Sequence, residues 1–115
     1  TGRTSDRDLN RLMAGAFCLT FVPYFEGFGL PLLEAMQSDV PIISGNTTSL
    51  PEVAGNAALY VDPFTVEEIA AAMTRMTTDV ALRQSLIEHG RIQRQKFSWE
   101  KTAEKLWSSI EKTFQ

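Results

Sequence analysis

The chain has 115 residues, of which 43% are hydrophobic and 22% charged, and its formal net charge is −3. This length and composition suit one compact domain with a real core, and the lack of a basic surplus argues against a nucleic-acid partner. The longest mainly apolar run, residues 14–23, is too short to span a bilayer, and the single cysteine, Cys18, favours a reducing, cytoplasmic setting.

Helix and strand patterns alternate through the first 61 residues. Ser5, with Asp8 three residues later, predicts a capped helix. Residues 17–22 then form a short run of β-formers that predicts a buried parallel strand. The elements expected after it are a helix over 31–38 that begins near Pro31, a strand over 40–44, a short helix over 50–54 stopped by Gly55, and a strand over 58–61.

Helical patterns alone follow. Thr65 and Glu68 are spaced as a second capping box, and a further helix is expected over residues 79–94. Ser98 should cap a last helix. The apolar faces expected to be buried are Leu9, Leu12, Met13 and Ala16 in the first helix, Val66, Ile69, Ala70, Met73 and Met76 after Thr65, and Trp99, Ala103, Leu106 and Ile110 in the last helix.

This order of elements predicts the α/β class, with a partial Rossmann-like parallel sheet of about three strands and helices on both faces. The opening helix would be a crossover with no strand before it. We therefore expect the chain to be part of a larger domain.

The segment FEGFGLPLLEAM, residues 25–36, lies between the first strand and the next helix, where open α/β sheets bind ligands. Gly27 and Gly29 would let the backbone approach a ligand, and the helix start would attract phosphate. Glu34 would suit a ribose diol, and Glu26 could accept hydrogen bonds from hydroxyls beyond the phosphates. Together they fit a nucleotide linked through diphosphate to a polyol.

Each of these features also has a plain structural explanation. Glu34 could be a solvated helix residue, Glu26 could be a turn residue, and a G-x-G pair alone is a weak signal. The residues by themselves therefore leave both interpretations open.

Residues 23–63, PYFEGFGLPLLEAMQSDVPIISGNTTSLPEVAGNAALYVDP, resemble the hallmark region of retaining GT-B-fold glycosyltransferases of the family four group, also called glycosyl transferases group 1. Glu26 and Glu34 match the family's pair of glutamates. Residues 39–42 match its next strand, residues 50–55 its third block, and residues 97–99 (FSW) its final helix. Asp39 departs from the pattern, because a glycine is more usual there.

The resemblance implies that residues 1–115 are the C-terminal half of a GT-B nucleotide-sugar-binding domain. It implies a catalytic role for Glu26, which would bind and orient the donor sugar, while Glu34 would hold the ribose. The backbone at residues Gly27, Phe28, Gly29 and Leu30 would contact the sugar and the diphosphate. Neither a metal nor another cofactor is expected.

The implied reaction is transfer of a sugar from a nucleotide-diphosphate-sugar to an acceptor hydroxyl with retention of configuration, in polysaccharide biosynthesis. A glycan or lipid-linked acceptor would bind a missing N-terminal domain, so we expect the fragment alone to be inactive and to self-associate. The parent would be cytoplasmic or membrane-peripheral. Two alternatives stay open: a GT-B-fold sugar-nucleotide epimerase, and a non-catalytic interaction module.

Overall fold

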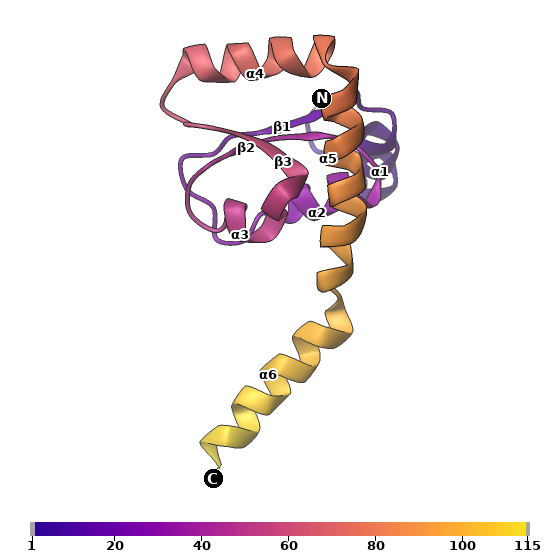
Figure 1. The fold of residues 1–115 in the computed structure, drawn as a ribbon. Helices are drawn as coiled ribbons and strands as arrows, with labels where there is room; N and C mark the ends of the chain where they lie inside the picture. The colour runs from indigo at the N-terminus through magenta and orange to yellow at the C-terminus, as the bar shows by residue number, and fades with distance from the viewer. Residues whose placement is uncertain (1, 115) are drawn as a thin grey trace.

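Helices and strands alternate through the first half of the chain, and helices alone follow (Figure 1). The computed structural model describes residues 2–114. Its elements are α1 (Asp6–Ala14), β1 (Leu19–Phe21), α2 (Leu30–Gln37), β2 (Ile42–Gly45), α3 (Leu50–Ala54), β3 (Ala58–Val61), α4 (Val66–Thr78), α5 (Val80–Gln93) and α6 (Trp99–Thr113), with short 3₁₀ turns η1 (Gly55–Ala57) and η2 (Arg94–Lys96). The predicted order of elements is confirmed.

The strands form one parallel sheet in the order β1–β2–β3. Leu19 of β1 is in register with Ile42 of β2, which is in register with Ala58 of β3. Parallel neighbours need crossover connections, and α2 and α3 provide them. These two helices lie on one side of the sheet and α4 on the other (Figure 1). The predicted fold class is therefore confirmed.

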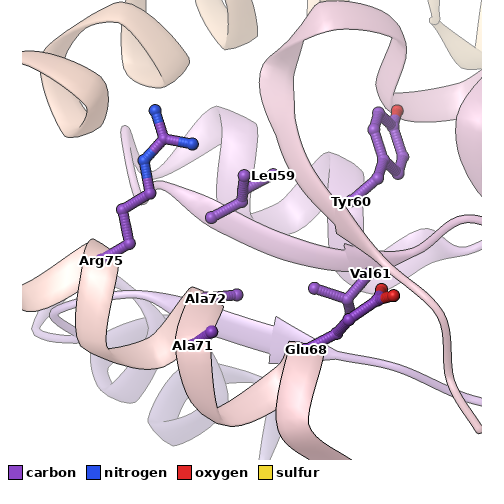
Figure 2. A pocket seen from close by; sticks show the side chains of 7 residues that line it. All are labelled: Leu59, Tyr60, Val61, Glu68, Ala71, Ala72 and Arg75. Carbon is purple, nitrogen blue, oxygen red and sulfur yellow. The ribbon is translucent and has the colours of Figure 1, made fainter. Parts of the chain in front are cut away.

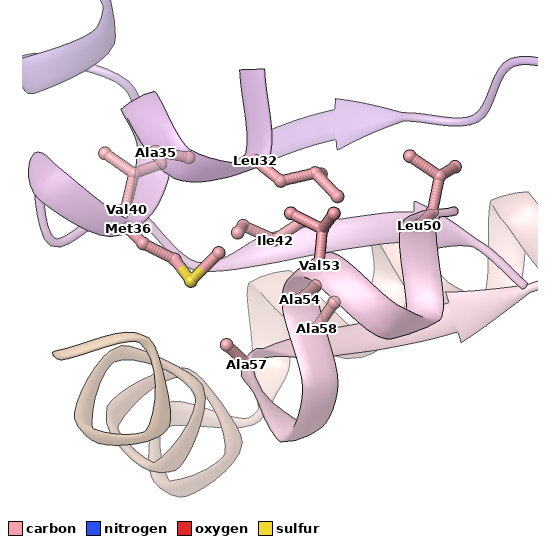
Figure 3. Packing of buried hydrophobic residues seen from close by; sticks show 10 residues of the cluster. All are labelled: Leu32, Ala35, Met36, Val40, Ile42, Leu50, Val53, Ala54, Ala57 and Ala58. Carbon is pink, nitrogen blue, oxygen red and sulfur yellow. The ribbon is translucent and has the colours of Figure 1, made fainter. Parts of the chain in front are cut away.

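Two neighbouring isoleucines of the central strand point to opposite faces of the sheet, because side chains alternate along a strand. Ile42 belongs to a core shared with α2 and α3, and Ile43 to a core shared with α4 and α5; both side chains are fully buried. Figure 3 shows the first core, made by Leu32, Ala35, Met36, Val40, Ile42, Leu50, Val53, Ala54, Ala57 and Ala58. Because both faces of the sheet are covered, all four residues of β2 are buried and none alternates to solvent.

Helix α5 ties the two faces together. Its first half supplies Leu86 to the core under α4, while Gly90 lies so close to α2 that a Cβ there would be 3.2 Å from Met36 Cγ. Further along, Nε2 of the buried Gln93 donates to the Val53 carbonyl at 2.9 Å. Helices α2 and α3 are thus both in direct contact with α5.

The connection after α2 contains the residue that departs from the family pattern. Asp39 has a φ of 55°, in the left-handed region that favours glycine, which explains why glycine is usual there. Its carboxylate accepts two hydrogen bonds from Arg91, at 3.1 and 2.9 Å, and one from Arg94 at 3.3 Å. The hydrogen bond from Arg91 holds the pKa of the Asp39 carboxyl below its ordinary value. The two ion pairs therefore link this turn to the end of α5 and to η2.

One of the two predicted capping boxes is wrong. The Ser5 side chain accepts from the Asp8 N–H as expected, but Thr65, although it is the N-cap of α4, makes no side-chain cap bond. Glu68 instead reaches past Thr65 and accepts from the N–H of Asp62 at 2.9 Å. The spacing of Thr65 and Glu68 fits a capping box, but the Glu68 carboxylate accepts from the Asp62 N–H instead of the Thr65 N–H.

Several residues predicted to be buried lie at the surface. Leu9 and Leu12 of α1 are 40% and 56% exposed, and Met73 of α4 is 44% exposed. Strand β1 is only half-buried, with Thr20 exposed, because within residues 2–114 it has a single neighbouring strand. The expectation of a fully buried first strand is therefore wrong for the described part of the chain.

Helix α6 projects away from the rest of the molecule (Figure 1), which gives the structure its extents of 55 × 30 × 30 Å. It contains no buried residue. Trp99, Leu106 and Ile110, which were predicted to be buried, are 78%, 63% and 38% exposed. Their spacing is that of an apolar helix face, but no surface among the described residues packs against it.

Candidate functional site

The loop of residues 22–29 joins the end of β1 to the start of α2, at the carboxyl edge of the sheet. One oxygen of Glu26, Oε1, accepts from the N–H groups of Gly27 and Phe28 at 3.1 and 3.4 Å. The other, Oε2, has no hydrogen-bond partner among residues 2–114. Glu26 thus acts as a turn residue through one oxygen and can accept a ligand hydroxyl with the other.

The two glycines of this loop meet different physical demands. Gly29 has a φ of 102°, and a Cβ there would lie 2.8 Å from Leu50 Cδ2, so both the backbone and the packing require glycine. A Cβ at Gly27 would meet nothing within 4 Å, and its φ is not positive. The fold therefore does not require glycine at position 27, and the space beside it is open to a ligand.

The loop after β2 supports the loop after β1. The Ser49 hydroxyl lies 2.9 Å from the carbonyl oxygen of Glu26 and 3.1 Å from that of Phe28, so it can donate to either. Leu50, the fully buried first residue of α3, packs beneath Gly29. Sequence reasoning missed Ser49; its place just before the Leu-Pro-Glu block was the available signal.

Two threonines in the same loop were also missed. Thr48 has a φ of 57°, which is rare for a β-branched residue. The hydroxyl oxygen of Thr47 is buried and has no hydrogen-bond partner within the part of the chain that the structure describes. Strained backbone and an unpaired buried hydroxyl are typical of binding sites. None of the predicted helices and strands includes these residues.

Helix α2 begins at Leu30, one residue before the expected Pro31. Pro31 has no N–H, and the Leu32 N–H donates to the Gly29 carbonyl at 3.0 Å. The N–H groups of Gly29 and Leu30 find no acceptor among residues 2–114. These two unpaired amides lie next to the positive end of the α2 dipole; Gly29 is buried and Leu30 is exposed.

Glu34 lines a groove of about 520 Å³ between α2 and the first turn of α6. Its wall also contains Phe28, Leu30, Phe97 and Trp99. The Glu34 carboxylate is half-buried and makes neither a hydrogen bond nor an ion pair with any described residue. An apolar groove with one unpaired carboxylate is the composition expected of a small-molecule site.

The structure places the predicted site residues on one short stretch, but not in one hollow. Phe28, Leu30 and Glu34 line the groove, whereas Glu26, Gly27 and Gly29 lie on the loop outside it. The role that the resemblance assigns to each residue stays a prediction.

A second hollow, of about 220 Å³, lies between β3 and α4. Figure 2 shows Glu68 and Arg75 of α4 beside it, with Leu59 and Val61 of β3 facing the helix. None of the predicted site residues lines it. Both charged side chains are already engaged, Glu68 with the Asp62 N–H and Arg75 with Asp79 at 3.6 Å. This hollow therefore offers less polar chemistry than the groove.

Residues 2–114 contain neither a cluster of metal-ligating side chains nor a membrane-spanning helix. No group of three or more His, Cys, Asp or Glu side chains is placed to hold a metal ion. No helix in this range is long and apolar enough to cross a membrane. The expectation of a metal-free reaction stays a prediction.

Residues 1–93 match the protein family described as glycosyl transferases group 1. The chain is 42% identical over 99 residues to the O-antigen chain mannosyltransferase B of Escherichia coli. The aligned residues cover 86% of this chain and 26% of that protein. It is 34% identical over 112 residues to the MMP alpha-(1->4)-mannosyltransferase of Mycolicibacterium hassiacum, covering 94% of this chain and 27% of that protein.

The structure is also similar to sucrose-phosphate synthase from Thermosynechococcus elongatus, a GT-B-fold protein. The TM-score is 0.83 at 27% sequence identity, over 99% of this chain and 29% of that one. The chain thus spans little more than a quarter of these three relatives.

Proposed function

The chain belongs to the glycosyl transferases group 1 family, and we propose that it supplies part of the donor site of a longer glycosyltransferase. That enzyme would transfer a sugar from a nucleotide-diphosphate-sugar to an acceptor hydroxyl with retention of configuration. In this proposal residues 1–115 are the C-terminal portion of the nucleotide-sugar-binding domain.

The observation that carries the proposal is the arrangement around the start of α2. Along the chain, two unpaired N–H groups, those of Gly29 and Leu30, come between a loop carboxylate, Glu26, and a helix carboxylate, Glu34. An anion fits the amides and the helix dipole, while each carboxylate suits hydroxyl donors. A diphosphate flanked by two polyols, a sugar and a ribose, has this sequence of groups.

Each residue then has a separate task. The diphosphate would accept from the Gly29 and Leu30 N–H groups, which would also stabilise the leaving-group charge. Oε2 of Glu26 would accept from the donor sugar, making Glu26 the catalytic residue of this chain, and the open space at Gly27 would admit the sugar. Glu34 would accept from the ribose hydroxyls within the groove, beside the ring of Phe28.

Mannose is the donor sugar we would test first, because the two curated relatives described above are named as mannosyltransferases. A glycan or lipid-linked acceptor fits the name of the O-antigen relative. No metal or other cofactor enters the proposal, and the cytoplasmic location stays a prediction.

The test measures nucleotide binding by calorimetry with a panel of nucleoside diphosphates and their mannose esters. Glu34→Gln should weaken the binding of both ligands, because a neutral amide accepts more weakly from a diol. Glu26→Gln should weaken only the sugar nucleotide, because Glu26 does not contact the nucleotide. The matched control is Glu52→Gln, at an exposed position of α3.

Equal binding by wild type and Glu34→Gln would contradict the ribose assignment. We further expect no sugar transfer by this chain alone, so measurable transfer would contradict the view that it holds only part of the site. Isomerisation of the donor sugar by the longer protein would favour the epimerase alternative.

A further inference from the structure

Tyr24 and Phe64 form a stacked aromatic pair, with ring centroids 4.9 Å apart and an interplanar angle of 22°. Tyr24 follows β1 and Phe64 follows β3, so the pair joins two loops at the carboxyl edge of the sheet. Despite the stacking, the two residues are 69% and 72% exposed. Because the rings stack on each other, each keeps one outward face exposed, and Tyr24 lies two residues before Glu26 in the chain.

The loop that carries Phe64 is held in place by hydrogen bonds that do not bury the ring. Oδ1 of Asp62 accepts from the Phe64 N–H at 2.9 Å, and Oε2 of Glu68 accepts from the Asp62 N–H at 2.9 Å. Glu68 is thereby diverted from capping α4, and Thr65 is left without a cap bond. The capping box expected from Thr65 and Glu68 is thus replaced by bonds that hold the loop carrying the exposed Phe64 ring. Such departures from local sequence preference are expected at functional surfaces. A ring held in advance also loses less entropy when it binds.

We propose that the Tyr24–Phe64 pair is a stacking subsite for one pyranose ring of the acceptor glycan, in addition to the contacts expected from an N-terminal domain; this inference rests on the proposed function. One face of a pyranose carries C–H groups of partial positive charge, which are attracted to the negative face of an aromatic ring. The Tyr24 hydroxyl provides a polar partner for the sugar hydroxyls at the edge of the pair.

A nucleobase would also stack on such a pair, but its expected position argues against it. In the proposed function the donor sugar lies at Glu26. The ribose lies at Glu34, which lines the groove between α2 and the first turn of α6. The base therefore extends from the Glu34 side, whereas the pair lies on the Glu26 side. The ring that stacks on the pair then belongs to the acceptor, next to the donor sugar.

The test is an NMR titration of the isotope-labelled chain with an α-linked mannotriose. We expect shifts confined to residues 23–26 and 62–65. Tyr24→Ala and Phe64→Ala should each weaken mannotriose binding about two- to tenfold, the range that corresponds to one aromatic contact. Phe64→Leu should weaken it as well, because leucine keeps apolar bulk but has no ring face. Phe114→Ala, which removes an 85% exposed ring at the far end of α6, is the matched control and should leave binding unchanged.

Unchanged mannotriose binding in Tyr24→Ala and Phe64→Ala would overturn the inference, as would the same shifts with guanosine or uridine monophosphate in place of the glycan. Variants that alter only self-association would overturn it too. Nucleotide binding by Glu34→Gln is measured separately from mannotriose binding. The proposed donor site can therefore be contradicted without contradicting the aromatic subsite, and the subsite without contradicting the donor site.

Discussion

Helices α2 and α6 both carry several apolar side chains, yet they differ in how much of their surface is buried. The eight residues of α2 include three that are buried, whereas none of the fifteen residues of α6 is. Helix α2 is held at its start by Leu50 against Gly29 and at its end by ion pairs to Asp39. An apolar face in the sequence indicates that a helix is stabilised by packing against another surface. Whether the face is buried depends on whether the fold provides that surface.

The largest expected loss of stability is for a leucine truncated in α2, compared with a leucine truncated in α6. Leu32→Ala in α2 removes a fully buried side chain and should lower the free energy of unfolding by about 2–5 kcal/mol. Leu106→Ala in α6 removes a side chain that is 63% exposed and should change it by less than about 0.5 kcal/mol. Urea denaturation followed by circular dichroism measures both. A large loss for Leu106→Ala would mean that α6 is packed in solution and would remove the contrast.

The two loop glycines sharpen the account of how α2 is anchored. Gly29→Ala forces a positive φ on alanine and brings Cβ to 2.8 Å from Leu50 Cδ2, so it should destabilise the fold by about 2–3 kcal/mol. Gly27→Ala should cost less than about 0.5 kcal/mol in the same denaturation experiment, because its Cβ meets open space. If Gly27→Ala proved as destabilising as Gly29→Ala, the space at position 27 would not be free for a ligand.

A smaller effect is expected where α5 holds the end of α3. Gln93→Ala removes the donor to the Val53 carbonyl and the acceptor of Lys96 at 2.7 Å, and should lower the free energy of unfolding by about 1–2 kcal/mol. Gln95→Ala, at an exposed position two residues later, is the control and should be neutral. Equal effects of the two variants would show that the buried amide adds nothing.

The smallest effect concerns Asp39 and depends on pH. Asn tolerates a positive φ but carries no charge, so Asp39→Asn isolates the ion pairs with Arg91 and Arg94. Since the folded pKa of Asp39 lies below its ordinary value of 3.8, its extra stability is present above that pH and disappears as the pH falls through the folded pKa. Thermal melts of wild type and variant should therefore differ slightly at pH 7 and converge once the pH falls below the folded pKa of Asp39.

A pH-independent difference between those melts would assign the effect of Asp39 to backbone geometry instead of charge. Added salt should also narrow the gap at pH 7, because both arginine partners of Asp39 are at least partly exposed.

Local chemistry made most of the fold predictable. The Ser5 cap, the Pro31 helix start and the turn at Gly55 act over a few residues, and each gives an element close to its expected bounds. The same local patterns failed where a distant group competed, as when the Asp62 N–H took Glu68 from its capping box. They also failed where burial required a surface that the described residues do not provide, as for Trp99 and Leu106.

For the candidate site, the sequence by itself determined the residue types and their order: a carboxylate, two glycines, a helix start and a second carboxylate. Only the tertiary structure decided that Gly29 is required by packing while Gly27 is not, and that Ser49 can donate to the loop carbonyls. It alone decided that Glu26 and Glu34 face different spaces and that Tyr24 meets Phe64. The reason is physical: these contacts join segments that are adjacent only once the parallel sheet has brought the carboxyl ends of its strands to one edge.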